Sequence, residues 1–328
     1  MGNNVQEALL IPDSVHEELS AQIRLVAPQF VCVPYREEGD LSPKVADAVA
    51  LLRWVGGKRF ASLIETDAPR IRWLHTASAG VDHVLMPPVR KRCEVGTLVL
   101  TDSGPAFGIA IGEFVLAWML AVSHRLSELH DQKQARRWQS LQHEELYGQT
   151  AGVIGLGPIG QGIAERCRAM GMRTIGLRRT PTAAPFVDET VTGPEGLRRL
   201  IGESDWVIIA AALTGETRHL IGEDEFIRMK TTARLVNIAR GGLVDETALI
   251  TALQKGELAG ACLDVFATEP LPLDSPLWDL PQVHIAPHNS SGWARGLRER
   301  QRQLFLNNVS RFAAGEPLAG IVDVSLGY

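Results

Sequence analysis

Apolar residues recur along the chain in short runs that alternate with stretches of helical spacing. In the first hundred residues the runs lie at 8–12, 30–34, 48–56, 71–78 and 97–103. Short apolar runs predict buried strands, whereas residues 13–27 begin with Asp13 and Ser14 and then repeat apolar residues at helical spacing. The alternation predicts a parallel sheet with helices on its faces.

A second alternation begins at Thr150. Its apolar runs lie at 150–157, 172–179, 205–213, 233–240, 260–266 and 283–288, and helical patterns separate most of them. Six strands opened by a glycine-rich turn predict a doubly wound, dinucleotide-binding domain. Between the two alternations, residues 107–138 form a long helical pattern that is apolar nearly all round in its first half. This pattern suits a helix shared between two domains or two subunits. A last helical pattern covers 295–317.

Composition narrows the class of protein. The 328 residues suggest two domains, and the net charge of −5 provides no basic excess for nucleic acid or anionic lipid. The four cysteines, Cys32, Cys93, Cys167 and Cys262, form no CxxC pair, which favours reduced thiols over disulfides or a metal site. The N-terminus has no signal-peptide pattern, and the apolar stretch 114–124 is too short to span a bilayer. We therefore expect a soluble cytoplasmic protein with no membrane partner.

The glycine-rich turn is Gly155-x-Gly157-x-x-Gly160, and it joins an apolar strand to a helix. In this context the first glycine allows a tight turn, the second admits a pyrophosphate, and the third lets helix and strand pack closely. The helix N-terminus would face the phosphates with free N–H groups. The turn therefore predicts dinucleotide binding.

The end of the next strand bears on which dinucleotide binds. NAD sites usually place an acidic residue there for the ribose 2′-hydroxyl, but this strand ends in Arg178, Arg179 and Thr180. A guanidinium suits a 2′-phosphate, which an aspartate would repel. Asp188 and Glu189 follow only after a segment that breaks the strand. We therefore predict NADP as the preferred cofactor, with NAD as the alternative.

Three polar side chains follow later strands of the second alternation. Arg240 ends one apolar run, Glu269 lies in the loop after Asp264, and His288 follows the last run. In open α/β sheets, ligands bind outside the carboxyl ends of the strands. One edge of the sheet would therefore collect an arginine, a carboxylate and a histidine.

Taken together, these stretches resemble the D-2-hydroxyacid dehydrogenases. The resemblance covers nearly the whole chain and rests on SAGVD (78–82), GVIGLGPIG (152–160), LTGETRHLI (213–221), MKTTARLVNIARGGLVDETAL (229–249), LAGACLDVFATEPLP (258–272), SPLW (275–278) and APHNSSG (286–292). It implies an α/β fold in which a Rossmann domain, residues 105–289, is inserted into a flavodoxin-like substrate domain made of 1–104 and 290–328. It also implies a homodimer formed through 107–138.

The same resemblance assigns roles to residues. Arg240, Glu269 and His288 would be the catalytic set for reducing a small 2-oxo acid to the D-2-hydroxy acid. His288 would give the proton, and Glu269 would fix its tautomer and favour the imidazolium. The cofactor would contact Gly155, Leu156, Gly157, Pro158, Ile159, Gly160, Arg178, Arg179, Thr180, Ala212, Leu213, Thr217, Ile238, Ala239, Arg240, Asp264, His288, Ser290 and Ser291.

Substrate recognition is expected from the backbone of Ser78, Ala79 and Gly80 and from Arg240 and His288. Trp54, His75 and Trp138 are further candidates for the pocket lining. Arg178, Arg179 and Thr180 resemble the corresponding segment of the NADPH-using glyoxylate and hydroxypyruvate reductases. Glu269 argues against the formate dehydrogenases, which resemble this family but have glutamine at that position.

Other functions fit less well. A short-chain dehydrogenase needs Tyr-x-x-x-Lys, and none of Tyr35, Tyr147 and Tyr328 has a lysine four residues on. HEELY (143–147) lacks the second histidine of a zinc-binding HExxH. The remaining alternatives are an NAD-linked dehydrogenase of a bulkier D-2-hydroxy acid or of phosphoglycerate, and a nucleotide-sensing corepressor on the same fold.

Overall fold

The computed structural model describes residues 7–54, 57–292 and 294–328. The chain divides into two compact units. Unit 1 combines the residues up to Ala106 with Arg295–Tyr328, and unit 2 is Phe107–Ala294. Two segments named in the sequence interpretation, the extreme N-terminus at 1–6 and the end of the predicted strand at 55–56, lie outside the described residues.

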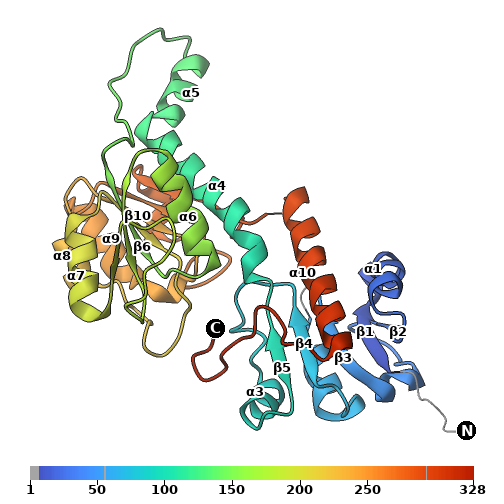
Figure 1. The fold of residues 1–328 in the computed structure, drawn as a ribbon. Coiled ribbons are helices and arrows are strands. Elements are labelled where there is room, and N and C mark those ends of the chain that lie inside the picture. The colour runs from blue at the N-terminus through green and yellow to red at the C-terminus, as the bar shows by residue number, and fades with distance from the viewer. Residues whose placement is uncertain (1–6, 55–56, 293) are drawn as a thin grey trace, which may run out of the picture. The chain divides into compact units, whose positions relative to one another are not determined.

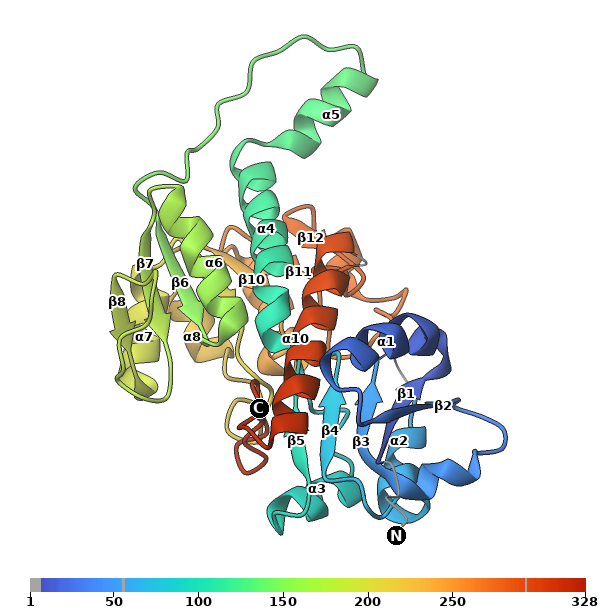
Figure 2. The same ribbon diagram turned by 45° about the vertical axis from the view of Figure 1, so that its right-hand side comes forward.

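Unit 1 is a parallel sheet with helices on both faces. Among its described residues the strands follow the order β2-β1-β3-β4-β5, which is the flavodoxin-like order. Their bounds are β1 (Ala8–Pro12), β2 (Val31–Tyr35), β3 (Ala48–Arg53), β4 (Trp73–Thr76) and β5 (Val99–Thr101). Helices α1 (Asp13–Val26) and α10 (Arg295–Ala314) lie side by side on one face (Figure 2). Helices α2 (Arg59–Ser62) and α3 (Pro87–Glu94) cover the other face.

Unit 2 has the strand order β12-β11-β10-β9-β6-β7-β8 in its described residues, with every pair parallel. The strands are β6 (Thr150–Ile154), β7 (Arg173–Leu177), β8 (Glu189–Val191), β9 (Trp206–Ile209), β10 (Arg234–Asn237), β11 (Gly260–Leu263) and β12 (Val283–Ile285). Figure 1 shows α7 (Gly193–Glu203) and α8 (Glu223–Arg228) on one side of this sheet and α6 (Pro158–Ala169) on the other. Helix α9 (Glu246–Lys255) packs with α7 and α8. The predicted doubly wound α/β class is therefore confirmed.

The strands are shorter than the apolar runs that predict them. The run 233–240, for example, becomes a strand only over Arg234–Asn237, and the run 260–266 only over Gly260–Leu263. The last residues of these runs leave the sheet and form loops at its carboxyl edge. The short strand β8 is an addition, because the sequence analysis expected no strand at Glu189–Val191.

The long helical pattern at 107–138 is not one helix. Helix α4 (Gly104–Ser123) ends before Arg125, whose backbone is left-handed with φ +55°, and α5 (Leu126–Gln134) follows. Side-chain contacts hold this turn, since Arg125 bonds to Glu128 and to the carbonyl of Gln142. No glycine or proline marks the break in the sequence. Helix α5 and residues 135–149 project from the rest of unit 2 (Figure 1).

Helix α4 has 20 residues and extends well before the apolar stretch 114–124 from which its length was judged. With 20 residues and a mean hydropathy of 1.9 it is long and apolar enough to cross a membrane by those two criteria alone. One of its faces packs closely on α6. A Cβ on Gly108 would lie 2.6 Å from the carbonyl oxygen of Pro158, and a Cβ on Gly162 would lie 2.5 Å from that of Gly108. The glycines therefore let two helices of unit 2 approach through their backbones.

Candidate active site

The turn between β6 and α6 has the geometry of a pyrophosphate cradle. Gly155 has φ +95°, and a Cβ there would lie 2.7 Å from the backbone of Ala211. A Cβ on Gly160 would lie 1.9 Å from the carbonyl oxygen of Gly155. At Gly157, in contrast, a Cβ would meet nothing within 4 Å. The first and third glycines are thus required by packing, and the second leaves room for a ligand at the N-terminus of α6.

The other residues of this turn support its shape. Pro158 begins α6, Ile159 is half-buried, and Leu156 is buried against Gly176. Gln161 donates a hydrogen bond from its side chain to the carbonyl of Leu156 at 2.9 Å. The sequence did not predict this supporting role of Gln161, because a polar residue in the first turn of a helix usually faces solvent.

The end of β7 presents basic rather than acidic side chains. Arg178 is half-buried and donates to the carbonyl of Thr182, and Arg179 and Thr180 are exposed. Asp188 lies at the opposite edge of the sheet, where it accepts hydrogen bonds from the backbone N–H and the hydroxyl of Thr174. These hydrogen bonds hold the pKa of Asp188 below its usual range. The described segment 178–187 holds no acidic residue, but Glu216 from the loop after β9 lies 3.9 Å from Nη2 of Arg179.

The loops after β9 and β10 are held by their own polar side chains. The Thr217 hydroxyl donates to the carbonyl of Ala212 at 2.7 Å, next to Leu213. After β10, the buried Asn237 side chain accepts from the N–H of Ala239 and donates to the carbonyl of Arg240. Asn237 thereby pins the Ile238–Arg240 turn. In the sequence, Asn237 lies in an apolar run that predicts only a buried strand. A single amide side chain inside that run, three residues before Arg240, was the signal for this role.

Arg240 follows the strand in extended conformation. Its Nη1 donates to the carbonyl of Ala239 at 2.8 Å. The next residue must be glycine, because a Cβ on Gly241 would lie 1.9 Å from the backbone carbon of Phe266. Close packing of the β10 and β11 loops accounts for that glycine.

His288 and Glu269 form a hydrogen-bonded pair. The Nδ1 atom of His288 lies 2.8 Å from Oε2 of Glu269, and the two side chains are 49% and 37% exposed. Because a carboxylate only accepts, Nδ1 carries the hydrogen of this bond and Nε2 is the nitrogen left for another partner. Glu269 is held in turn, since its Oε1 accepts the backbone N–H of Phe266.

The loop that carries His288 is anchored by Asp264. This fully buried carboxylate accepts the backbone N–H groups of Asn289 at 2.6 Å and Ser290 at 2.9 Å. His288 itself has a left-handed backbone with φ +53°, and its N–H bonds to the carbonyl of Asp264. Ser290 is buried and Ser291 half-buried. Apart from Trp138, the predicted residues of unit 2 therefore lie at the carboxyl edge of the parallel sheet, in its loops or in the first turn of α6.

In unit 1 the predicted residues follow β3 and β4. The Ser78–Gly80 turn is half-buried, and the Ser78 hydroxyl donates to the carbonyl of Gly80 at 2.9 Å. Trp54 packs against the core beneath α1 and α10. His75 is completely buried with its ring nitrogens bonded to Thr101 and Ser103, and burial lowers its pKa to about 3. Trp138, in unit 2, is fully exposed.

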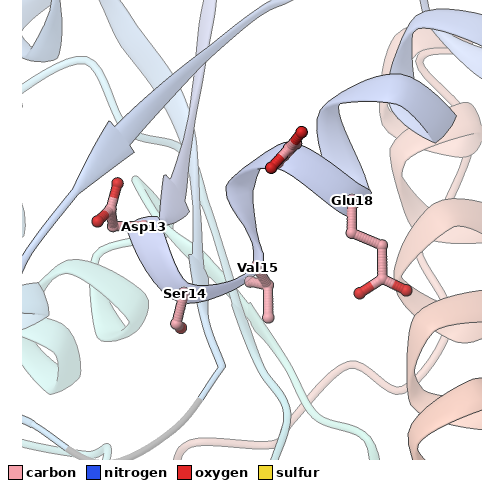
Figure 3. A pocket seen from close by; sticks show the side chains of 5 residues that line it. Asp13, Ser14, Val15 and Glu18 are labelled. Atoms are coloured by element: carbon pink, nitrogen blue, oxygen red, sulfur yellow. The ribbon is translucent and has the colours of Figure 1, made fainter.

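A hollow on α1 does not suit an acidic substrate. Figure 3 shows Asp13, Ser14, Val15 and Glu18 around it. Asp13 pairs with Arg36, and Glu18 pairs with Arg302. An anion would meet carboxylates there, so this hollow is not the candidate substrate site.

The fold and the glycine turn define a dinucleotide-binding protein. Comparison with known proteins agrees, because residues 116–290 match the family "D-isomer specific 2-hydroxyacid dehydrogenase, NAD binding domain". The chain belongs to this D-isomer specific 2-hydroxyacid dehydrogenase family, and it is an NAD(P)-dependent oxidoreductase.

Individual relatives cover most of the chain. A glyoxylate reductase of Thermococcus gammatolerans is 36% identical over 287 residues, which are 84% of this chain and 83% of the relative. A glyoxylate/hydroxypyruvate reductase B of Pectobacterium carotovorum is 35% identical over 72% of this chain and 74% of its own. The crystal structure of a D-isomer specific 2-hydroxyacid dehydrogenase from Xanthobacter autotrophicus, in complex with NADPH and MES, superposes with a TM-score of 0.83 at 27% identity, covering 98% of this chain and 99% of that one.

Proposed function

We propose that this protein reduces small 2-oxo acids of the glyoxylate and hydroxypyruvate type to D-2-hydroxy acids and prefers NADPH. The observation that carries the proposal is the 2.8 Å hydrogen bond between His288 Nδ1 and Glu269 Oε2, at the sheet edge that also bears the glycine turn. A histidine held in this way directs Nε2 away from its carboxylate, so that Nε2 can pass a proton to a substrate oxygen. His288 is the general acid for the carbonyl oxygen, and Glu269 stabilises its protonated form.

Arg240 is the group that holds the substrate. A guanidinium binds a carboxylate through two parallel hydrogen bonds and polarises a neighbouring carbonyl oxygen. The Asn237 side chain bonds to the N–H of Ala239 and to the carbonyl of Arg240. These hydrogen bonds fix the backbone from which the guanidinium side chain extends. The backbone N–H groups of the Ser78–Gly80 turn serve the substrate carboxylate in unit 1.

Gly155–Gly160 would hold the pyrophosphate of the cofactor at the carboxyl edge of unit 2. Bound nicotinamide supplies the hydride for the carbonyl carbon. Arg178, Arg179 and Thr180 receive the 2′-phosphate through charge-assisted hydrogen bonds, and the phosphate displaces the exposed Glu216 carboxylate from Arg179. The NADPH complex of the Xanthobacter relative supports this preference. Ala212, Leu213, Thr217, Ile238, Ala239, Ser290 and Ser291 line the remaining cofactor contacts, and the fully buried Asp264 supports the loop that carries Ser290.

The test is cofactor oxidation with a panel of 2-oxo acids, measured with NADPH and with NADH. We expect turnover of glyoxylate and hydroxypyruvate with a higher kcat/KM for NADPH. His288→Ala should lower kcat by about 100-fold or more. Arg240→Lys should also lose activity, because the ammonium of lysine is a point charge and does not replace the planar guanidinium. A wild-type rate for His288→Ala would refute its role as general acid. A higher kcat/KM with NADH than with NADPH would refute the cofactor preference.

The protein acts as a cytoplasmic homodimer joined through residues 107–138. Apolar side chains exposed in this region support the interface: Trp138 is fully exposed, and Ile109, Leu126 and Leu129 are 43%, 50% and 42% exposed. Light scattering of the purified protein should give twice the chain mass, and Leu126→Asp combined with Leu129→Asp should shift the protein toward monomer. A monomeric wild-type protein would contradict the dimer.

A further inference from the structure

Helix α10 carries a buried amide, that of Gln301, on the face that packs against the sheet of unit 1. Phe305 of this face stacks on Trp73 of β4, with ring centroids 5.7 Å apart. Gln301 lies four residues earlier, so it shares the face, and it is only 8% exposed. Its Nε2 donates a hydrogen bond to the carbonyl of Ala77, the residue that follows β4. Gln301 therefore reaches the start of the Ser78–Gly80 turn from 224 positions away in the chain.

Packing alone does not explain an amide at this position. An unpaired amide is costly to bury, and a paired one adds little to stability over an apolar side chain of the same shape. An apolar residue at position 301 would continue the face formed by Phe305, Leu306 and Val309. Among the described residues, Gln301 is the donor that the carbonyl of Ala77 receives. The hydrogen bond to this carbonyl is therefore what the glutamine contributes.

A second donor holds the next carbonyl of the chain. The backbone N–H of Ser103, a fully buried residue, donates to the carbonyl of Ser78 at 3.0 Å. The hydroxyl of Ser103 lies 3.1 Å from Nε2 of His75, which is completely buried in β4. Ser103 is therefore fixed by a contact with β4 itself. Two successive carbonyls, those of Ala77 and Ser78, are thus held by buried donors within unit 1.

These two hydrogen bonds decide which way the N–H groups of the turn face. In a trans peptide the carbonyl of one residue and the N–H of the next point in opposite directions. The bond to the Ala77 carbonyl therefore turns the N–H of Ser78 away from Gln301, and the bond to the Ser78 carbonyl turns the N–H of Ala79 away from its donor. Among the described residues, the Ser78 N–H has only a long contact of 3.5 Å, to the Thr76 hydroxyl, and the Ala79 N–H bonds to none. Both N–H groups are available to an anion.

We propose that Gln301 is a positioning residue for the substrate carboxylate, because it holds the Ala77 carbonyl and thereby directs the Ser78 N–H toward the place where that carboxylate binds. This inference rests on the proposed function, in which the Ser78–Gly80 turn receives the carboxylate of a 2-oxo acid. Gln301 itself does not touch the substrate. Its loss lets the Ala77–Ser78 peptide rotate, which weakens carboxylate binding and leaves the cofactor contacts of unit 2 as they are.

The first test is Gln301→Met, which keeps the length of the side chain and removes its hydrogen-bond donor. We expect KM for glyoxylate and for hydroxypyruvate to rise about fivefold or more, the effect of one weakened hydrogen bond to an anion. The KM for NADPH and kcat should change less than about twofold, because a contact that serves ground state and transition state equally alters the substrate KM alone. Gln301→Asn withdraws the amide by one methylene group. It should raise the same KM, and it is the second variant if Gln301→Met folds poorly.

Asn308→Leu is the matched control. Asn308 is also a buried amide of α10, and its side chain bonds to the carbonyl of Ala319 at 2.9 Å and to the N–H of Ala319 at 2.8 Å. Gln301→Met and Asn308→Leu should both lower the midpoint of thermal unfolding, but only Gln301→Met should raise the KM for 2-oxo acids. The same rise of KM in both variants, or an unchanged KM in Gln301→Met and Gln301→Asn, would overturn the proposal.

A binding measurement separates this proposal from the proposed reaction. Oxamate, an unreactive analogue of a 2-oxo acid, is titrated by calorimetry into the protein saturated with NADPH. Gln301→Met should weaken oxamate binding about fivefold or more, and Asn308→Leu should leave it unchanged. If wild type binds oxamate but reduces no 2-oxo acid, the proposed function fails while the comparison of the two variants still decides the role of Gln301. If wild type neither binds oxamate nor reduces a 2-oxo acid, the inference fails as well.

Discussion

The buried carboxylate of Asp264 accepts the backbone N–H of Asn289 at 2.6 Å, one residue beyond His288. Its second oxygen accepts the N–H of Ser290, so a single side chain satisfies two successive N–H groups. These bonds hold His288 in a left-handed backbone, a conformation that is unfavourable for residues other than glycine. Asp264 is therefore a positioning residue for the proposed general acid.

Replacing Asp264 by Asn puts an NH₂ group against one of these N–H groups. The lost hydrogen bond should release the His288 loop and lower kcat by about 100-fold, the scale of a misplaced catalytic group. Steady-state kinetics and thermal unfolding measure the effect. Asp188→Asn is the control, since Asp188 also accepts a backbone N–H but at the opposite edge of the sheet. It should lose stability and keep its kcat, and the same loss of kcat in both variants would argue against positioning.

Glu269→Gln keeps a hydrogen-bond acceptor for His288 but removes the charge that stabilises the imidazolium. We expect kcat to fall about tenfold or more. In a His288→Ala background the same change should have no further effect, because the two residues act as one unit. Glu246→Gln is the matched control, since Glu246 accepts the N–H of Ala267 in the same loop. Additive effects of Glu269→Gln and His288→Ala would refute the coupling.

Arg178→Ala should weaken NADPH use selectively. Loss of a charge-assisted hydrogen bond to a phosphate costs about 1.5–3 kcal/mol, which lowers kcat/KM for NADPH by roughly 10- to 150-fold. The value for NADH should stay within about threefold, because NADH has no 2′-phosphate. Arg173→Ala serves as control, since Arg173 begins the same strand and pairs with Glu189 and Glu203. Equal losses with both cofactors would show that Arg178 does not read the phosphate.

His75 should make the protein less stable in acid. Its pKa is about 3 in the folded protein against an ordinary value of 6.5, so between these values the unfolded chain binds more protons. Stability therefore rises with pH through this window and is complete above it. From pH 7.5 to pH 5 the loss is about 2 kcal/mol. His75→Gln should remove this part in urea unfolding. Burial also lowers the pKa of the half-buried His284. His75→Gln should therefore keep a smaller loss of stability in acid that comes from His284. An unchanged pH dependence in His75→Gln would contradict the assignment.

Gly162→Ala should destabilise unit 2. The new Cβ would lie 2.5 Å from the carbonyl oxygen of Gly108, so α4 and α6 would have to move apart. Overpacking of this kind costs about 1–3 kcal/mol, measurable by chemical unfolding. Gly202→Ala in α7 is the matched control, because its Cβ would meet only a carbonyl oxygen at 3.8 Å. That variant should gain roughly 0.5–1 kcal/mol from helix propensity. Equal effects at the two sites would mean that the α4–α6 approach is not tight.

The sequence by itself determined the fold class and the residues at the ends of the strands. Apolar runs and helical spacing are local, and parallel strands bring their carboxyl ends to one edge, so Gly155, Arg240 and His288 were found without coordinates. Asp245, the N-cap of α9, accepts the N–H of Ala248 only three residues on, so this contact also depends on local sequence.

Only the tertiary structure decided how those residues are held. The Asp264 carboxylate meets the loop after His288 from 25 positions away in the chain, and Gly241 is glycine because a separate loop occupies the space of its side chain. The break between α4 and α5 arises from contacts of Arg125 with Gln142 rather than from a helix-breaking residue. These features depend on contacts between residues distant in sequence, which periodicity and spacing do not encode.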